Sequence, residues 1–393
     1  MTYPTANWSF PTSIRFGAGR IAELSAVCQA AGITRPLLVT DAGLAKLPMV
    51  ADALSQCKDA GLAAALFADA RPNPVESNVH DGVAAFRDGE HDGVIAMGGG
   101  SALDCGKLIA FMNVQTRPIW DFEDIGDWWT RAHSDGIAPI IAVPTTAGTG
   151  SEVGRAGVVT NEETCTKKVI FHPNMLPAVV IADPELTVGM PPFITAGTGM
   201  DALAHCLEAY CAPSYHPMAD GIALEGIRLV FENLPKVYMD GTDIEARGHM
   251  MSAAAMGAVA FQKGLGAIHS LSHPIGALYD THHGMTNAVF MPYVLDFNRL
   301  AIEGKIQRLA AYLGLNGGFS RFLDAILELR QTLNVPHALP ELQPNNSDTS
   351  IDDQHRQRIA EMAIVDPTAN GNPVPLTIEG AQKIFDAALN GNI

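Results

Sequence analysis

The 393-residue chain has few basic residues, with 25 Lys and Arg against 42 Asp and Glu, and its formal net charge is −17. Nucleic acids and anionic membrane surfaces attract positively charged proteins, so neither is expected as a partner. The six cysteines form no CxxC pair and no disulfide-framework spacing, which favours a reducing cytoplasm. No apolar run approaches the roughly 18 residues of a membrane span, and no basic-then-apolar leader pattern opens the sequence. A soluble, unexported protein is expected.

Hydrophobic residues make up 47% of the chain, which is enough for well-buried cores in two or three domains. The first 190 residues alternate between two kinds of pattern. Strands are expected at 13–16, 36–40, 63–68, 93–97 and 139–143, and helices at 21–31, 49–60, 76–88 and 102–111. A β-rich stretch follows over 158–183. Strands that alternate with helices predict a mainly parallel sheet covered on both faces.

The pattern changes near Pro191 and Pro192, and from Thr195 onward helical periodicity continues without a convincing strand. The expected fold class is therefore α/β plus all-α. An α/β domain is expected over residues 1–190, and a helical domain over residues 191–393.

Two i,i+4 pairs of metal-ligating residue types lie in the helical part. Asp201 and His205 form one pair, and His269 and His273 form the other. Residues at this spacing share one face of a helix, so two helices can enclose a divalent ion with a carboxylate and two or three imidazoles. This donor set suits Zn or Fe, and an open position suits Lewis-acid chemistry. The alternative is a structural role, which is more common for a lone His-x-x-x-His.

A further imidazole follows the second pair. Pro274 and Gly276 are expected to disturb the helix, and a turn at 279–281 is expected to bring His283 back toward the first two histidines. A third histidine beside two same-face pairs strengthens the metal interpretation.

The segment 98–101, Gly-Gly-Gly-Ser, lies between an expected strand and an expected helix. Glycines there allow backbone N–H groups to approach a phosphate, and a helix N-terminus adds favourable partial charge. The spacing matches neither a P-loop nor GxGxxG, so a tight strand-to-helix turn is the alternative. The segment 144–152, rich in threonine and glycine, is a second such loop, and two loops in one domain favour a shared dinucleotide.

Asp41 ends an early expected strand. A carboxylate there can accept hydrogen bonds from a ribose 2′-OH and repel a 2′-phosphate, which would favour NAD over NADP. The alternative is an Asp that starts a turn with Gly43.

Together, the segments 98–101, 144–152, 199–205 and 266–283 resemble the iron-containing (group III) alcohol dehydrogenase family. The resemblance extends from about residue 13 to about residue 315. It implies a Rossmann-like dinucleotide-binding domain followed by a helical metal-binding domain, the dehydroquinate synthase-like arrangement, with the active site between them. A homodimer or larger assembly is also implied, and the early strand at 13–16 is a candidate contact.

The resemblance also assigns roles to matching positions. It places His273 beside the nicotinamide. Metal ligation is implied for Asp201, His205, His269 and His283. NAD contacts are implied for Asp41, Gly98, Gly99, Gly100, Ser101, Thr145, Thr146, Thr149 and Lys167. The family usually has one histidine where this chain has His282 and His283, and the spacing favours His283.

The expected activity is hydride transfer between NAD(H) and a small alcohol or aldehyde. Fe²⁺ is the ion that the resemblance implies, and the donor set also allows Zn²⁺. His273 is expected to relay the alcohol proton, with simple packing beside the cofactor as the alternative. Arg155 and Lys263 are basic positions that would favour a substrate with an anionic or polar tail, unless they are solvated or structural cations.

Two other enzyme classes fit parts of the pattern. A dehydroquinate-synthase-like lyase also uses NAD and a metal, but it would need clustered basic residues for a sugar phosphate. A metal-dependent hydrolase would need a water-activating carboxylate and no dinucleotide loops.

Overall fold

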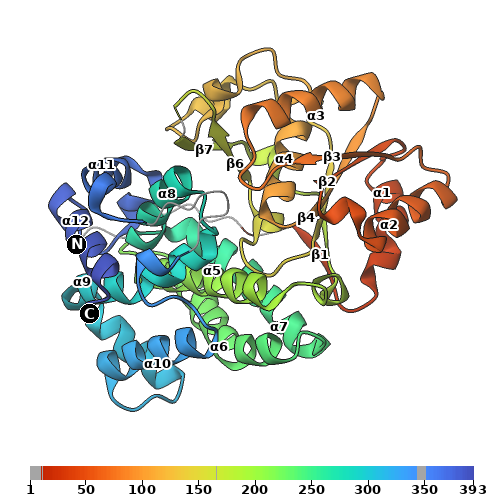
Figure 1. The fold of residues 1–393 in the computed structure, drawn as a ribbon. Helices are drawn as coiled ribbons and strands as arrows, with labels where there is room; N and C mark the ends of the chain where they lie inside the picture. Colours follow the sequence, from red (N-terminus) through yellow and green to blue (C-terminus); the bar gives the residue numbers. More distant parts are fainter. Residues whose placement is uncertain (1–9, 11, 165, 343–350) are drawn as a thin grey trace. The chain divides into compact units, whose positions relative to one another are not determined.

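The computed structural model describes residue 10 and residues 12–164, 166–342 and 351–393. This part of the chain forms two compact units, one within residues 10–189 and the other within residues 190–393 (Figure 1). The first unit contains a β-sheet with helices. In the second unit, every regular element among the described residues is helical. The expected fold class is confirmed.

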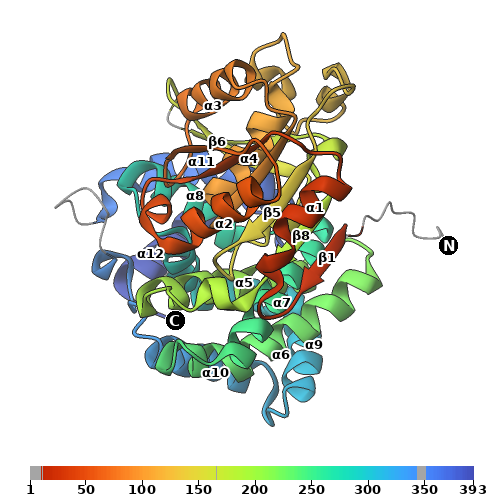
Figure 2. The same ribbon diagram turned by 90° about the vertical axis from the view of Figure 1, so that its right-hand side faces the viewer.

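The first unit is built on a six-stranded sheet in which every strand pair is parallel. Its spatial order is β1-β8-β5-β4-β2-β3, and Figure 2 shows β1, β8 and β5 side by side. The strands are β1 (Ser13–Phe16), β2 (Pro36–Asp41), β3 (Ala65–Ala70), β4 (Gly93–Gly98), β5 (Ile140–Pro144) and β8 (Val179–Ala182). The remaining two, β6 (Ala156–Asn161) and β7 (Thr166–Phe171), form a separate antiparallel pair. The expected β-rich stretch therefore divides between two sheets.

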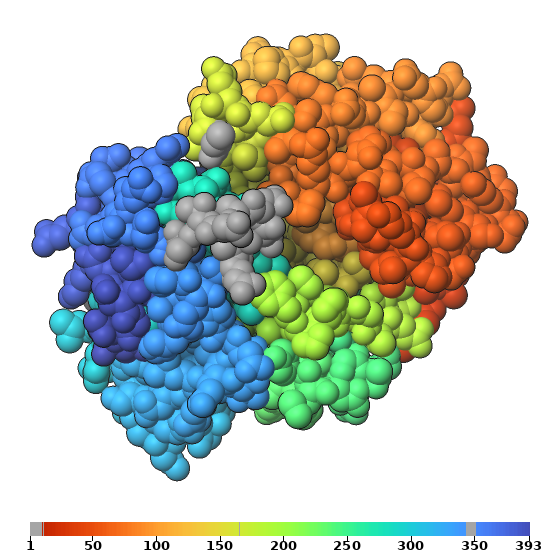
Figure 3. Space-filling model, viewed as in Figure 1, coloured from red at the N-terminus to blue at the C-terminus, as the bar shows by residue number. Residues whose placement is uncertain are grey.

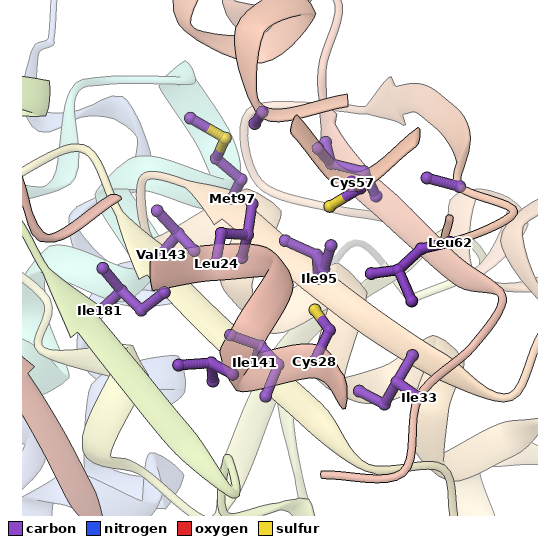
Figure 4. Close-up of a cluster of buried hydrophobic side chains, with 14 of the residues drawn as sticks. Leu24, Cys28, Ile33, Cys57, Leu62, Ile95, Met97, Ile141, Val143 and Ile181 are labelled. Carbon is purple, nitrogen blue, oxygen red and sulfur yellow. The ribbon is translucent and has the colours of Figure 1, made fainter. Parts of the chain in front are cut away.

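Helices cover both faces of the six-stranded sheet. On one face, α1 (Leu24–Ala30) and α2 (Pro48–Asp59) pack on alternate strand residues such as Ile95 and Ile141 (Figure 4). On the other face, α4 (Gly100–Met112) lies so close that a Cβ added at Gly106 would be 2.6 Å from the Cβ of Ala96. Because β4 is covered on both sides, all of its residues are buried, as expected for a central parallel strand. The helix α3 (Glu76–Asp88) contacts α4 and lies at the surface of the unit (Figure 3).

The strand order reverses between the neighbouring strands β2 and β4. The chain runs from β2 outward to β3, but from β4 in the opposite direction to β5. Ligands of open parallel sheets bind outside the carboxyl ends of the strands at such a switch point. Here those ends are Asp41 on β2 and Gly98 on β4, both of which are candidate cofactor residues.

The second unit consists of helices around α5 (Pro192–Cys211), which contacts α6, α7 and α9. The other helices are α6 (Pro217–Met239), α7 (Ile244–Ala260), α8 (Ala267–Tyr279), α9 (His283–Tyr312), α10 (Gly318–Thr332), α11 (Arg356–Val365) and α12 (Ile378–Asn390). Within the described ranges, no helix is both long enough and apolar enough to span a bilayer.

Small residues allow the neighbouring helices to approach α5 closely. A Cβ added at Gly226 of α6 would lie 2.5 Å from Sγ of Cys206, and one at Gly257 of α7 would lie 3.0 Å from Cβ of His205. A larger side chain at either position would press against the side chain of Cys206 or His205 on α5. The backbone that carries His205 is therefore fixed by its neighbours.

The helix α8 runs through Pro274 and Gly276 to Tyr279, so the expected disturbance at these two residues is wrong. Proline removes only one backbone hydrogen bond, the one to the carbonyl of Ser270, and packing of α8 against α9 and α11 compensates for this loss. The helix ends at Tyr279, and the next residue, Asp280, adopts the left-handed conformation with φ 50° and ψ 45°. This turn reverses the chain into α9.

Candidate metal centre and cofactor-binding loops

Four candidate ligands converge in the helical unit. Oδ1 of Asp201 lies 3.8 Å from Nε2 of His205, 3.6 Å from Nε2 of His269 and 3.5 Å from Nε2 of His283. Asp201 and His205 lie on one face of α5, His269 lies on α8, and His283 is the first residue of α9. The structure therefore brings together a carboxylate and three imidazoles from three helices, which are labelled in Figure 1.

The spacing of these donor atoms fits a metal ion. Tetrahedral coordination with bonds near 2.1 Å separates neighbouring donors by about 3.4 Å. The three separations between Oδ1 of Asp201 and the imidazole nitrogens, 3.5 to 3.8 Å, are close to that value. The ligand atoms of Asp201, His205 and His269 all lie within 4.8 Å of one another, and all three residues are buried.

Glu208 fixes the orientation of His269. It lies on α5 one turn beyond His205, and its Oε2 accepts a hydrogen bond from Nδ1 of His269 at 2.6 Å. Its Oε1 accepts the backbone N–H of Ile268 at 2.7 Å. A carboxylate only accepts, so Nδ1 carries a proton and Nε2 is the ring nitrogen that faces Asp201. Metal-ligating histidines are commonly oriented in this way.

The amide of Asn287 lies against the same donor atoms. Its Nδ2 is 2.8 Å from Oδ1 of Asp201, 3.2 Å from Nε2 of His269 and 3.1 Å from Nε2 of His283. Its Oδ1 is buried and has no hydrogen-bond partner among the described residues. Three acceptors thus converge on one neutral nitrogen, in a position where a cation would interact with them more strongly.

The electrostatics of the cluster also favour a cation. Burial alone raises the pKa of Asp201, but His205, His283 and His269 outweigh it and hold this pKa far below its usual range. Burial alone lowers the pKa of His269, but Glu208 and Asp201 raise it to about 9. Two buried carboxylates, those of Asp201 and Glu208, therefore require positive charge from protonated rings or from a bound ion.

Two glycines bring the start of α9 against α5. A Cβ added at Gly284 would lie 2.0 Å from the carbonyl oxygen of Gly197, so only glycine fits. His282 caps α9, with Nδ1 accepting the backbone N–H of Met285 at 3.4 Å, and its ring lies 5.4 Å from that of Phe193. His282 therefore packs beside α5, while His283 faces Asp201.

His273 lies beside the ligand set. Its ring stacks on that of His283 with centroids 5.3 Å apart and planes 17° apart. Its Nδ1 is 2.8 Å from Oδ2 of Asp366. Burial alone raises the pKa of Asp366, but His273 and Thr368 outweigh it and lower this pKa.

At the carboxyl end of β4, each glycine of the 98–101 segment makes a close approach. Gly98 has φ +148°, and a Cβ there would lie 2.7 Å from Cβ of Ala102. A Cβ at Gly99 would lie 3.3 Å from Cγ2 of Thr146, and one at Gly100 would lie 2.6 Å from Cγ2 of Thr149. The backbone N–H of Thr145 donates to the carbonyl of Gly98 at 2.9 Å. The two expected loops are therefore packed directly against each other.

Ser101 and Lys167 are connected through Asn73. The backbone N–H of Asn73 donates to Oγ of Ser101 at 3.3 Å, and Nζ of Lys167 donates to Oδ1 of Asn73 at 2.8 Å. Asn73 has a positive φ of 54°, which few residues other than glycine adopt. Asn73 is therefore a further candidate cofactor-binding residue, and it was not recognised from the sequence.

Asp41 forms a turn with Gly43, which was the alternative to a ribose contact in the sequence analysis. Its Oδ1 accepts the backbone N–H groups of Gly43 at 2.8 Å and Leu44 at 2.9 Å. This turn fixes the carboxylate at the end of β2, at the switch point of the sheet. The turn and a ribose contact are compatible roles, because both bonds use one oxygen.

A buried polar cluster holds the second loop against α4. Oγ of Ser151 donates to Oδ1 of Asp104 at 2.5 Å, and Nζ of Lys107 donates to the carbonyl of Ser151 at 3.1 Å. Burial raises the pKa of Glu152, the next residue, to about 7, although Lys107 partly opposes this.

Lys263 and Arg155, the two basic residues considered for substrate recognition, differ in their surroundings. The side chain of Lys263 is buried, donates to the carbonyl of Tyr210 at 3.1 Å and forms an ion pair with Asp220. Lys263 is therefore a structural cation, and the expected role in substrate recognition is wrong for it. The guanidinium of Arg155 lies 5.2 Å from the ring centre of Phe171 and is partly exposed.

Three residues around the candidate metal centre were not recognised from the sequence. Glu208 follows Asp201 by seven positions and Asn287 follows His283 by four, so helical periodicity could have found both. Asp366 lies on a distant segment, and no local signal connects it to His273.

Comparison with known proteins gives a consistent result. The family model described as iron-containing alcohol dehydrogenase matches residues 11–184, and the model of the C-terminal part of the Fe-containing alcohol dehydrogenase family matches residues 195–389. A 4-hydroxybutyrate dehydrogenase from Cupriavidus necator is 37% identical over 96% of this chain and 98% of its own.

Solved structures agree with this comparison. The crystal structure of a 1,3-propanediol oxidoreductase superposes with a TM-score of 0.91 at 35% identity, covering 98% of this chain and 100% of that one. A sulfoacetaldehyde reductase from Bifidobacterium kashiwanohense in complex with NAD⁺ gives a TM-score of 0.86 at 29% identity, with 98% of each chain covered.

Proposed function

The chain belongs to the iron-containing alcohol dehydrogenase family, and on this basis we propose that it interconverts a small alcohol and its aldehyde with NAD(H). The observation that carries the proposal is the convergence of three imidazole nitrogens on one carboxylate oxygen, each 3.5 to 3.8 Å from Oδ1 of Asp201. A bound metal ion supplies Lewis acidity toward the substrate oxygen, and a bound nicotinamide accepts or returns the hydride. The residues proposed to hold the ion are Asp201, His205, His269 and His283.

We assign two further roles at this centre, the orientation of a ligand to Glu208 and the transfer of the alcohol proton to His273. Glu208 keeps the proton of His269 on Nδ1, so Nε2 is free to bind. His273 is not needed as a ligand, and we assign it the uptake of the alcohol proton and its release to solvent. The stacking of its ring on that of His283, beside the proposed ligands, supports this assignment.

NAD is the proposed cofactor, with contacts from residues at or after the carboxyl ends of β2, β4 and β5 and from Lys167 on β7. The switch point of the sheet, the paired glycine and threonine loops and the carboxylate of Asp41 support this assignment. The NAD⁺ complex of the sulfoacetaldehyde reductase supports it as well. The proposed contacts are Asp41, Gly98, Gly99, Gly100, Ser101, Thr145, Thr146, Thr149 and Lys167.

Fe²⁺ is the proposed ion, in keeping with the family, although imidazole and carboxylate donors also accept Zn²⁺. For the substrate, we propose a short alcohol or aldehyde with a polar or anionic end. Three of the similar proteins are named for 4-hydroxybutyrate, 1,3-propanediol and sulfoacetaldehyde, each of which has a second polar group. Arg155 is the remaining candidate for recognising an anionic end.

One experiment tests these assignments together. Alcohols and aldehydes, with and without a terminal carboxylate, are assayed with NAD(H) and NADP(H) on Fe- and Zn-loaded enzyme. We expect NADH formation from an alcohol, a higher kcat/KM for the polar substrates, and loss of activity on chelation. Turnover without net NADH formation would instead favour a dehydroquinate-synthase-like lyase. A preference for a simple alkanal that is unchanged in Arg155→Ala would exclude the anionic substrate.

We also propose that two copies pair through β1. This strand is at the edge of the sheet, and all four of its residues are exposed, including Ile14 and Phe16. Edge strands with exposed apolar side chains are templates for pairing with a second chain. Light scattering on the Phe16→Lys variant should show a shift toward monomer, with Leu66→Lys on β3 as the control.

The cytoplasm is the proposed compartment. All cysteines in the described ranges are free and buried, at positions 28, 57, 105, 206 and 211. Free thiols persist in a reducing compartment. Fractionation of cells that express a tagged chain would test this assignment.

A further inference from the structure

Asp366 makes an unexplained contact with His273. It follows α11 and caps the short 3₁₀ helix Pro367–Gly371, far along the chain from the rest of the centre. Its Oδ2 lies 2.8 Å from Nδ1 of His273. The two side chains are 11% and 21% exposed, so little water competes for this contact.

The two oxygens of Asp366 have different partners. Oδ1 accepts the backbone N–H of Thr368 at 2.9 Å and its hydroxyl at 2.5 Å. Oδ2 is left to face His273. The cap therefore fixes the orientation of the carboxylate, and the carboxylate in turn fixes the ring.

A carboxylate only accepts hydrogen bonds, so Nδ1 of His273 must carry the proton and Nε2 must carry the lone pair. The ring cannot rotate freely, because it also stacks on His283. We propose that Asp366 is a positioning residue that holds His273 in the tautomer whose Nε2 can accept the alcohol proton.

The inference rests on the proposed function. In the proposed alcohol oxidation, bound NAD⁺ would supply the hydride acceptor and Nε2 of His273 would take the hydroxyl proton. The resulting imidazolium would keep its Nδ1–H bound to Asp366. Release of the Nε2 proton to solvent restores the ring, so the products are aldehyde, NADH and one proton. An imidazole of the opposite tautomer has no lone pair at Nε2 and cannot take part.

The substitution Asp366→Asn should change the tautomer of His273 while it keeps the turn that residue 366 caps. The backbone N–H of Thr368 can only donate, so the amide oxygen of the variant must remain at the Oδ1 position. The amide NH₂ then replaces Oδ2 and donates to Nδ1, which moves the ring proton to Nε2. Asn is as good a cap as Asp, so the turn is retained. Asp243→Asn, at the cap of α7 where the side chain accepts the N–H of Ala246 at 3.0 Å, is the matched control.

The first readout is independent of catalysis. In metal-free protein labelled with ¹⁵N-histidine, long-range ¹H–¹⁵N spectra should show His273 as the Nδ1–H tautomer in the wild type and as the Nε2–H tautomer in Asp366→Asn. The Asp243→Asn control should give the wild-type spectrum. An unchanged tautomer in Asp366→Asn would overturn the proposal.

The second readout is kinetic. With unchanged metal content, Asp366→Asn should lower kcat by on the order of 10- to 100-fold, the usual effect of losing an orienting partner, and should change KM less. The solvent deuterium isotope effect on kcat should rise as proton transfer becomes slower. Normal kcat with a switched tautomer would also overturn the proposal. Absence of alcohol oxidation in the wild type would refute the proposed function instead, and the spectra would remain interpretable.

Discussion

Nδ1 of His269 lies 2.6 Å from Oε2 of Glu208, while Oε1 of the same carboxylate is fixed by the backbone N–H of Ile268. In Glu208→Gln the amide oxygen must stay with Ile268, so the NH₂ group faces Nδ1 and moves the ring proton to Nε2. We expect metal affinity to fall by on the order of 10- to 100-fold. Competition with a chromophoric chelator measures this change, and the exposed Glu232→Gln on α6 is the control. Unchanged affinity would mean that Glu208 does not orient the ring.

Removal of Asn287 should matter more to the metal-free protein than to the metal-bound protein. Its Nδ2 provides hydrogen bonds to Asp201, His269 and His283, and a bound ion would take over this role. For Asn287→Ala without metal we expect a loss of about 1–3 kcal/mol in the free energy of unfolding, and a smaller loss with metal. Urea titrations with and without chelator measure both. As the control, Asn233→Ala on α6 should lower the free energy of unfolding equally with and without metal. Equal losses with and without metal in Asn287→Ala would contradict the prediction.

Gly100→Ala should weaken NADH binding without affecting the metal. The added Cβ would lie 2.6 Å from Cγ2 of Thr149, so the two cofactor loops must separate. Overpacking of this kind costs about 1–3 kcal/mol, which corresponds to roughly a 5- to 150-fold rise in the dissociation constant of NADH. Fluorescence titration measures it. Gly189→Ala, where a Cβ would meet no atom within 4 Å, should bind NADH normally.

Glu152 should make the α/β unit less stable above neutral pH. Burial raises its pKa from 4.5 to about 7, so its contribution to stability is full below pH 4.5 and is lost as the pH rises through about 7. In Glu152→Gln this loss is absent. Urea titrations should therefore give similar stabilities for wild type and variant at pH 5, and a variant that is more stable by about 3 kcal/mol at pH 8.5. A difference that does not grow with pH would show that the carboxyl group is already ionised at pH 5.

The strands and helices of the first unit were predictable because their periodicities are local. The run 93–98 is continuously apolar because both faces of β4 are covered, and the sequence shows this directly. The strand order was not predictable, since the sequence does not show that β1 pairs with β8. Continuation of α8 through Pro274 was missed because the packing of α9 and α11 against it outweighs the intrinsic preference of proline.

The candidate metal ligands were predictable for the same reason. Residues four positions apart lie on the same face of a helix, so the sequence alone was enough to pair Asp201 with His205. The contact between Asp366 and His273 joins segments 93 residues apart, and only tertiary structure reveals it. Lys263 was misjudged because proximity to His269 in sequence does not show which way a side chain points.

Because the four candidate ligands come from α5, α8 and α9, no short peptide of this chain contains the complete set. A growing polypeptide emerging from the ribosome can therefore offer an ion only fragments, and full capture must wait until α9 has been synthesised and has docked. Loading of the proposed ion would then be a late event in biogenesis.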